Sequence, residues 1–269
     1  MSYKSILVHV ETGARAEHRV ALAAGLAERF AARLIGLTAV LPPTWGGVAG
    51  LPQLIADIEK SNEAYIGACR AIFQAATAGR PEDAEFRYHI GAARQALAEE
   101  SVFSDLVVVG ETGNDSPEES LLSADDALFA ASAPVLVVPH DFEGAFDPAT
   151  VFIAWKATRE AARALRDALP FLHAARKILV GVVASADTES DERLDDIAQY
   201  LGRHGLQAEI RELPAHGSVG RTIIDQAGAA GAGLIVAGGY GHAPLREWLM
   251  GGVTQALLHD CPIPSLMSH

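Results

Sequence analysis

Short apolar runs alternate with longer amphipathic stretches along the whole of this 269-residue chain. Runs of β-branched and aliphatic residues predict buried strands, and apolar residues at helical spacing predict helices. In the first half these patterns predict strands at 4–10, 33–40, 85–90, 105–109 and 135–138. They predict helices between those strands at 16–32, 51–78, 92–100 and 118–131.

The second half repeats the same order of elements. Its patterns predict strands at 151–155, 177–183, 207–213, 234–237 and 262–266, and helices at 158–169, 189–203, 219–229 and 244–258. The first strands of the two halves lie 145 residues apart, and a glycine turn behind each fourth strand recurs after 128 residues. An internal repeat of this length indicates two similar domains rather than a solenoid. We therefore expect one domain at 1–140, a linker at 141–148 and a second domain at 149–269.

The alternation of nearly all-apolar strands with helices predicts an α/β fold. Strands buried on both faces are typical of parallel sheets that helices cover on each side. We expect two tandem flavodoxin-like or Rossmann-like domains, each with a five-stranded parallel sheet. In such a sheet a ligand binds beyond the carboxyl ends of the strands where the winding reverses, here after the first and fourth strands of each repeat.

The residues after the fourth strand of the second repeat are rich in glycine. Gly238-Gly239-Tyr240-Gly241 follows the apolar strand, and Gly251-Gly252-Val253-Thr254 comes nine residues later. A strand, a glycine turn and a helix in this order direct backbone N–H groups toward a phosphate. The alternative is a tight turn without a ligand, with the second glycine pair serving helix packing.

The first repeat carries a poorer copy of this pattern. Gly110 and Gly113 keep the spacing, but Ser123-Ala124 replaces the second glycine pair, and Glu11 follows the first strand. Carboxylates stand between the two parts of the pattern, and they oppose a bound phosphate: Glu111, Asp115, Glu118 and Glu119. We therefore expect the first domain to be a degenerate copy that binds no nucleotide.

The spacing G-x2-G-x9-G resembles the nucleotide motif of the ATP-binding universal stress proteins, G-x2-G-x9-G-(S/T). Strands like 6–10 and 133–138, and the strand and helix at 151–169, extend the resemblance over the whole chain. In that family an aspartate after the first strand meets the adenine, whereas this chain has Lys156 there, and Gly252 replaces the final Ser/Thr. The resemblance implies a nucleotide site formed by Trp155, Lys156, Gly238, Gly241, His242, Arg246, Gly251, Gly252, Val253 and Thr254.

The charge balance excludes several classes of partner. The net charge of −13 argues against nucleic-acid and anionic-membrane binding, which require a basic surface. Residues 1–146 carry a net charge of −10 and residues 147–269 only −3, so the second half is the better place for a polyphosphate. The two cysteines have no metal-ligand spacing. We expect a cytoplasmic protein with neither a signal peptide nor a membrane span.

No motif for covalent chemistry or P-loop hydrolysis occurs in the chain. The preferred hypothesis is a module in which ATP or a related adenine nucleotide, with Mg²⁺ only as its counterion, gates association with an unknown protein partner. The alternatives are a weak ATPase and a nucleotide-free scaffold for an apolar small molecule or a protein. The resemblance also implies that the final strands of the two halves pair as an intramolecular pseudo-dimer, or in a homodimer, although Pro262 and Pro264 limit such pairing.

Overall fold

The chain folds into two compact units, Ser2–Ala133 and Pro134–His269. The computed structural model describes residues 2–43, 52–79, 81–111, 122–183, 194–213, 217–240 and 252–269. Parts of four expected helices, at 51, 118–121, 189–193 and 244–251, lie outside the described residues.

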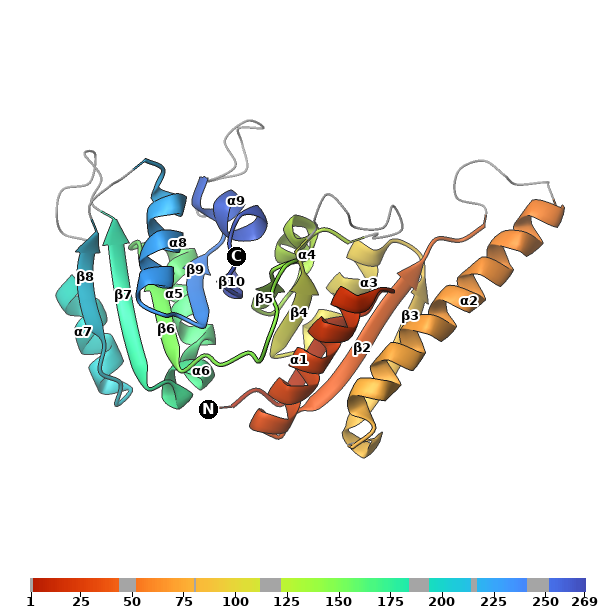
Figure 1. Ribbon diagram of the computed structural model, residues 1–269, viewed down its shortest axis with the longest axis horizontal. Helices are drawn as coiled ribbons and strands as arrows, with labels where there is room; N and C mark the ends of the chain where they lie inside the picture. The colour runs from red at the N-terminus through yellow and green to blue at the C-terminus, as the bar shows by residue number, and fades with distance from the viewer. Residues whose placement is uncertain are drawn as a thin grey trace. The chain divides into compact units, whose positions relative to one another are not determined.

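The first unit alternates strands with helices. Its elements are β1 (Ser5–His9), α1 (Ala14–Phe30), β2 (Arg33–Val40), α2 (Pro52–Thr77), η1 (Pro81–Asp83), β3 (Ala84–Ile90), α3 (Ala93–Glu100), η2 (Ser101–Phe103), β4 (Leu106–Gly110) and α4 (Ala124–Ala130). The strands form a parallel sheet in the order β3-β2-β1-β4. Helices α1 and α2 cover one face and α3 and α4 the other (Figure 1). The predicted α/β class is confirmed.

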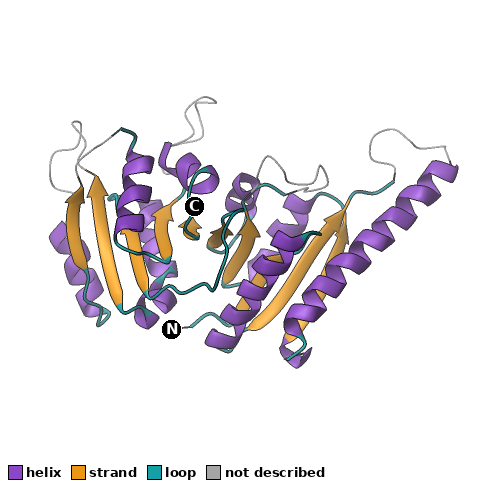
Figure 2. Cartoon of the chain, in the orientation of Figure 1, coloured by secondary structure: helices purple, strands orange, loops and turns teal. Residues whose placement is uncertain are grey.

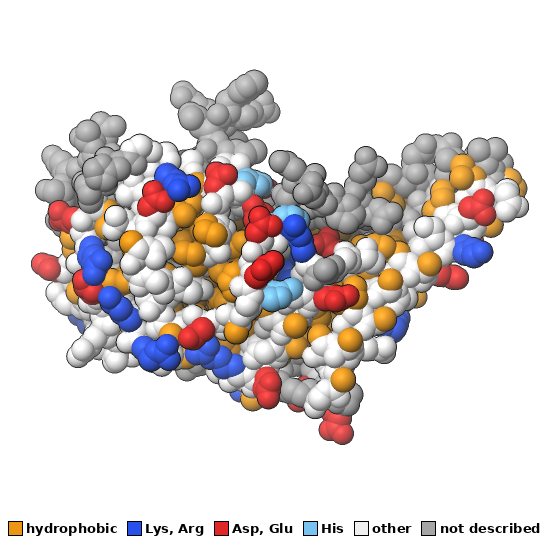
Figure 3. Space-filling view, in the orientation of Figure 1, with side chains coloured by type: hydrophobic (Ala, Val, Ile, Leu, Met, Phe, Trp, Pro, Cys, Tyr) orange, Lys and Arg blue, Asp and Glu red, His pale blue; other side chains and the backbone are white. Residues whose placement is uncertain are grey.

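The central strands of this unit form its core. Leu7 in β1 and Val107 in β4 are completely buried, as expected for strands that helices cover on both faces. Helix α2 is different, because its only buried side chains are Cys69, Phe73 and Thr77 near its C-terminal end. Apolar side chains are accordingly visible along α2 in the space-filling view (Figure 3).

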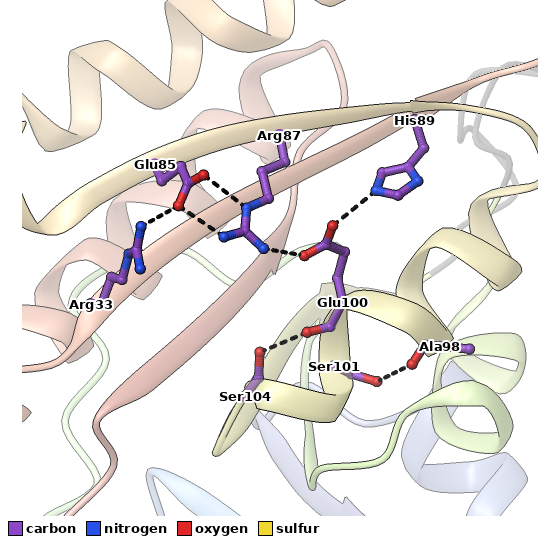
Figure 4. Close-up of polar contacts among 8 residues, drawn as sticks. All are labelled: Arg33, Glu85, Arg87, His89, Ala98, Glu100, Ser101 and Ser104. Atoms are coloured by element: carbon purple, nitrogen blue, oxygen red, sulfur yellow. Dashed lines mark hydrogen bonds and ion pairs between the residues drawn. The ribbon is translucent and has the colours of Figure 1, made fainter.

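The outer strand β3 departs from the expectation of all-apolar strands. On the face toward α3 it carries Glu85, Arg87 and His89, which are linked with Arg33 and Glu100 in one chain of hydrogen bonds and ion pairs (Figure 4). Arg87 Nη2 lies 2.9 Å from Glu85 Oε2, and His89 Nε2 lies 2.9 Å from Glu100 Oε1. The hydrogen bond from Arg87 holds the pKa of the Glu85 carboxyl below its usual range. Because an edge strand is half-exposed, its polar and apolar residues alternate with a period of two.

The second unit contains β5 (Val135–Val138), β6 (Thr150–Ala154), α5 (Arg159–Asp167), α6 (Leu169–Ala174), β7 (Lys177–Val183), α7 (Leu194–Arg203), β8 (Glu209–Leu213), α8 (Val219–Ala229), β9 (Leu234–Gly238), α9 (Gly252–His259) and β10 (Ser265–Ser268). Its sheet has the order β5-β10-β9-β6-β7-β8. The strands are parallel except for β5, which pairs with β10 in the antiparallel sense. Helices α5, α6 and α7 lie on one face and α8 and α9 on the other (Figure 1 and Figure 2).

The pairing expected between the two final strands is present, with Leu266 opposite Leu136. The predicted position of the last strand was wrong, because β10 begins at Ser265, after both prolines. Pro262 and Pro264 lack an N–H group for a ladder bond, so regular pairing begins only beyond them.

Most predicted helices differ by a few residues from the helices of the structure, and two of these differences have a clear cause. The helix expected at 158–169 ends at Asp167, and a separate α6 with Pro170 in its first turn follows it. Proline fits the first turn of a helix but disrupts its interior, so two short helices replace one long one. Residues Leu122 and Ser123 were expected to be helical, but α4 starts at Ala124 because Ser123 caps it.

Membrane insertion has no support in the described helices. None of them combines the length and the apolar composition that a membrane span requires. The Cys69 and Cys261 side chains are both buried.

Candidate functional site

The carboxyl ends of β6 and β9 lie side by side in the second unit. The two strands pair in parallel, with Ala154 opposite Ala237. Trp155 and Lys156 follow β6 directly, and Gly238 ends β9. The fold therefore brings these three candidate residues to one edge of the sheet, which we call the carboxyl edge.

The turn after β9 is held by hydrogen bonds within the unit. The Gly239 N–H donates to the Ser268 carbonyl at 2.8 Å, and the Tyr240 N–H donates to Thr254 Oγ1 at 3.3 Å. Tyr240 has a φ of 50°, in the left-handed region that non-glycine residues seldom adopt. The amide of Gln255 donates to the Tyr240 hydroxyl at 3.4 Å. Thr254 thus fixes the turn, and these two backbone donors already have protein acceptors.

Gly238 lies against the first turn of α5. A Cβ atom at this position would come within 2.5 Å of the Ala161 nitrogen and 2.8 Å of the Glu160 carbonyl carbon. The same turn is capped by Thr158, whose hydroxyl accepts from the Ala161 N–H at 3.2 Å. Close packing of helix on strand therefore requires a glycine at 238, whether or not a ligand binds.

A buried carboxylate lies in this first turn of α5. Burial opposes ionisation of Glu160, but its own backbone N–H and the Arg159 guanidinium hold the pKa of the carboxyl below its usual range. Arg159 Nη2 lies 3.0 Å from Glu160 Oε1. This negative charge stabilises the N-terminal end of α5.

The other candidate residues of the second unit are more open. Gly252 begins α9 and is exposed, and a Cβ atom built on it would have no neighbour within 4 Å. Val253 is half-buried, and the Lys156 side chain is exposed while its carbonyl accepts from the Thr158 N–H at 2.6 Å. Gly241, His242, Arg246 and Gly251 lie outside the described residues.

The corresponding edge of the first unit is filled by an arginine. Arg19 of α1 donates through Nε to the His9 carbonyl at 3.2 Å, and its Nη2 lies 2.8 Å from Glu11 Oε1. The Arg19 side chain is only 4% exposed. A Cβ atom on Gly110 would overlap Arg19 Nη1, so the guanidinium occupies the space between the ends of β1 and β4.

Arg19 was not among the predicted site residues. It stands at the position that Ala164 takes in the second repeat, 145 residues later. It also interrupts the apolar face of α1, between the buried Ala16 and Ala23. A long cation on the buried face of a helix requires a buried partner, and Glu11 supplies it. An arginine on the apolar face of α1, together with a glutamate directly after β1, is the sequence signal from which Arg19 could have been found.

His9 lies buried at the same edge. Burial lowers the pKa of its imidazole from 6.5 to about 4; the Glu11 carboxylate raises this pKa and the Arg19 guanidinium lowers it further. The imidazole is therefore neutral at pH 7.

The remaining candidates of the first unit have structural roles. Ser123 Oγ accepts from the Asp126 N–H at 3.0 Å and caps α4. Ala124 is completely buried, and Gly113 lies outside the described residues. Within the described ranges, no group of three or more His, Cys, Asp or Glu side chains is arranged to hold a metal ion.

Comparison with protein families gives one result for both halves. The model of the Universal stress protein family matches residues 2–139 and again residues 150–269. The comparison with curated proteins gives no match.

Solved structures resemble the chain over nearly its full length. A universal stress protein from Archaeoglobus fulgidus DSM 4304 is 15% identical, with a TM-score of 0.72 over 97% of each chain. A functionally unknown protein from Pseudomonas aeruginosa PAO1 is 18% identical, with a TM-score of 0.58 over 98% of this chain and 92% of that one. A universal stress protein solved in complex with cAMP is 27% identical and covers 51% of this chain and 98% of its own, with a TM-score of 0.39. The two full-length likenesses show the fold alone.

Proposed function

Because the chain belongs to the universal stress protein family, with one copy of the domain in each half, we propose that its second unit binds ATP or a related adenine nucleotide with little or no turnover. One nucleotide binds per chain. Binding gates association with a protein partner, and Mg²⁺ enters only with the nucleotide.

The contrast between the two carboxyl edges carries this proposal. In the first unit the Arg19 guanidinium fills the space beside Gly110 and neutralises Glu11. In the second unit Ala164 stands in place of Arg19, and Gly252 leaves open space at the start of α9. The first N–H groups of a helix have no intrahelical partner and attract an anion.

The donors of the proposed site follow from what the turn already uses. Gly239 and Tyr240 donate within the protein, so we assign the phosphate to the start of α9 at Gly252 and Val253, and to the motif residues Gly241, His242, Arg246 and Gly251. Lys156 is a donor and has no acceptor for the adenine amino group, so its contribution is to the phosphates. Trp155 lies beside it at the end of β6.

A calorimetric titration with ATP tests the proposal through two matched substitutions. Gly252→Ser restores the hydroxyl of the family motif at an open position, and Ala124→Ser makes the same change at the equivalent position of the first unit. We expect one site per chain, with an affinity that rises roughly tenfold in Gly252→Ser because a hydrogen bond to a charged group contributes about 1.5–3 kcal/mol. The Ala124→Ser protein is expected to bind as the parent protein does.

Two equivalent ATP sites per chain would refute the assignment to the second unit. The absence of any heat of binding in both the parent protein and Gly252→Ser would refute nucleotide binding itself.

Turnover is a separate measurement. Hydrolysis requires a positioned water and usually a base or metal ligand near the γ-phosphate. Glu247 is the only carboxylate of the motif segment, and it lies outside the described residues. We expect phosphate release far below the roughly 1–100 s⁻¹ of kinases. A magnesium-dependent rate in that range, lost in Glu247→Gln, would identify an ATPase instead.

A further inference from the structure

A groove between α5 and α7 of the second unit lies outside the nucleotide motif. Its volume is about 460 Å³, within the range of roughly 300–1,000 Å³ that is typical of small-molecule sites. Trp155 and Thr158 line it at the start of α5, and Ile197 and Tyr200 line it from α7.

The two helices run in the same direction along this groove. Strands β6, β7 and β8 are parallel, so each connecting helix returns from the carboxyl edge toward the opposite edge. Arg166 comes eight residues after Thr158 on α5, and Arg203 comes seven residues after Asp196 on α7. At 1.5 Å per residue these separations are about 10–12 Å. The two arginine positions therefore lie toward the end of the groove remote from the start of α5.

The wall between these ends is apolar. Leu165 is 3% exposed and Ile197 is 2% exposed, and Ala162 lies between Thr158 and Leu165 on the same side of α5. A hydrocarbon or aromatic group gains about 25 cal/mol for each Å² that such a wall removes from water.

The arginines of the groove differ from the other arginines of this unit. Five of the seven arginines that the structure describes in residues 134–269 form ion pairs: Arg159, Arg163, Arg176, Arg211 and Arg221. The two without an ion pair to a described residue are Arg166 and Arg203, and both line the groove. Each lies in the last turn of its helix, where a cation is favourable. That position does not explain why both lack carboxylate partners in a chain with a net charge of −13.

We propose that this groove binds a small carboxylic acid with an apolar body, at a site that is separate from the glycine motif and shares only Trp155 with the proposed nucleotide site. Arg166 and Arg203 hold the carboxylate, in the paired geometry that guanidinium groups favour. The apolar body lies along Leu165 and Ile197 and ends against the Trp155 indole. Asp196 lines the Trp155 end, so the ligand enters with its anionic end toward the arginines.

Titration calorimetry of the full-length protein with octanoate tests this site. We expect saturable binding of one octanoate per chain, and no saturable binding of the neutral analogue 1-octanol or of octylammonium. Arg166→Ala and Arg203→Ala are each expected to weaken octanoate binding roughly tenfold or more, because each removes a hydrogen-bonded charge. Arg176→Ala is the matched control, since Arg176 is an exposed arginine of the same unit that pairs with Asp147 away from the groove.

Three results would overturn the proposal: no saturable octanoate binding, equal binding of 1-octanol, or an unchanged affinity in both groove variants. Displacement of octanoate by ATP at one shared site would show instead that the groove belongs to the nucleotide. If the protein is saturated with ATP and its affinity for octanoate stays unchanged, the result supports two separate sites.

Discussion

At the scale of single residues, the two repeats differ at a position of their first helices that lies next to the glycine turn. Arg19 in the first unit corresponds to Ala164 in the second. The arginine places a nearly buried charge beside Gly110 and requires Glu11 as its partner, because an unpaired buried charge is strongly destabilising. In the second unit the backbone of α5 at Glu160 and Ala161 packs directly on Gly238. The glycine that ends the fourth strand therefore contacts a side chain in the first unit and helix backbone in the second.

His9 makes the first unit sensitive to acid. Its pKa is about 4 in the folded protein and about 6.5 in the unfolded chain, so between these values only the unfolded chain binds the proton. The stability is complete above pH 6.5 and falls as the pH falls toward 4, by up to about 3 kcal/mol from this group. We expect urea unfolding of the parent protein to show this loss, and His9→Phe to lose less over the same interval.

The comparison with His9→Phe separates this effect from the carboxylates that also titrate in acid. His173→Phe serves as the control for the change of side chain, because His173 is an exposed histidine of the second unit. Identical pH profiles for the parent protein and His9→Phe would show that His9 does not titrate below its usual range.

At the scale of elements, the contact between α8 and α9 depends on a single glycine. A Cβ atom on Gly220 would come within 2.6 Å of Ala256 Cβ and 2.9 Å of the Gly252 carbonyl oxygen. Helix α9 begins at Gly252, so this contact also positions the end of the nucleotide motif. Gly228 lies on the same helix α8, and a Cβ atom there would have no neighbour within 4 Å.

These two glycines provide a matched pair of substitutions. We expect Gly220→Ala to destabilise the protein by about 1–3 kcal/mol, because the backbone of α9 must move to admit the methyl group. Gly228→Ala is expected to stabilise it by up to about 1 kcal/mol, through the better helix propensity of alanine. Chemical denaturation measures both, and equal effects of the two substitutions would argue against close packing at Gly220.

At the scale of the whole molecule, the fifth strand of the first repeat belongs to the second compact unit. Strand β5 pairs with β10, and all four of its residues are buried. The following segment also packs on this unit, since the ring of Phe146 lies 6.0 Å from that of Phe171. We infer that the second unit depends on residues before the linker.

Two fragments test this dependence. Residues 134–269 retain β5, whereas residues 149–269 leave β10 as an open edge. We expect the shorter fragment to lose on the order of 3 kcal/mol of stability, because the apolar side chains of β5 are missing, and to self-associate through the edge strand. Equal unfolding midpoints for two monomeric fragments would place the boundary after β5 instead.

The sequence by itself determined the class of fold and most of its elements. Strands 33–40, 135–138 and 177–183 and helix 219–229 have the predicted limits, because their patterns of burial are local and their ends carry turn or capping residues. Thr158 and Ser218 cap helices as their residue types indicate. The glycines of the motif were also recognisable, since their spacing is a property of the chain alone.

Only the tertiary structure decided what surrounds those glycines. Arg19 of α1 contacts Gly110, and the first turn of α5 contacts Gly238. Each contact joins residues that are far apart in the sequence, so no local pattern predicts it. The hydrogen bond from the Tyr240 N–H to Thr254 Oγ1 also joins two separate segments of the chain. The same is true of the pairing of β10 with β5, which begins only at Ser265. The groove between α5 and α7 exists because parallel crossovers place two helices side by side. Local periodicity specifies which face of an element is buried, and packing alone specifies what it is buried against.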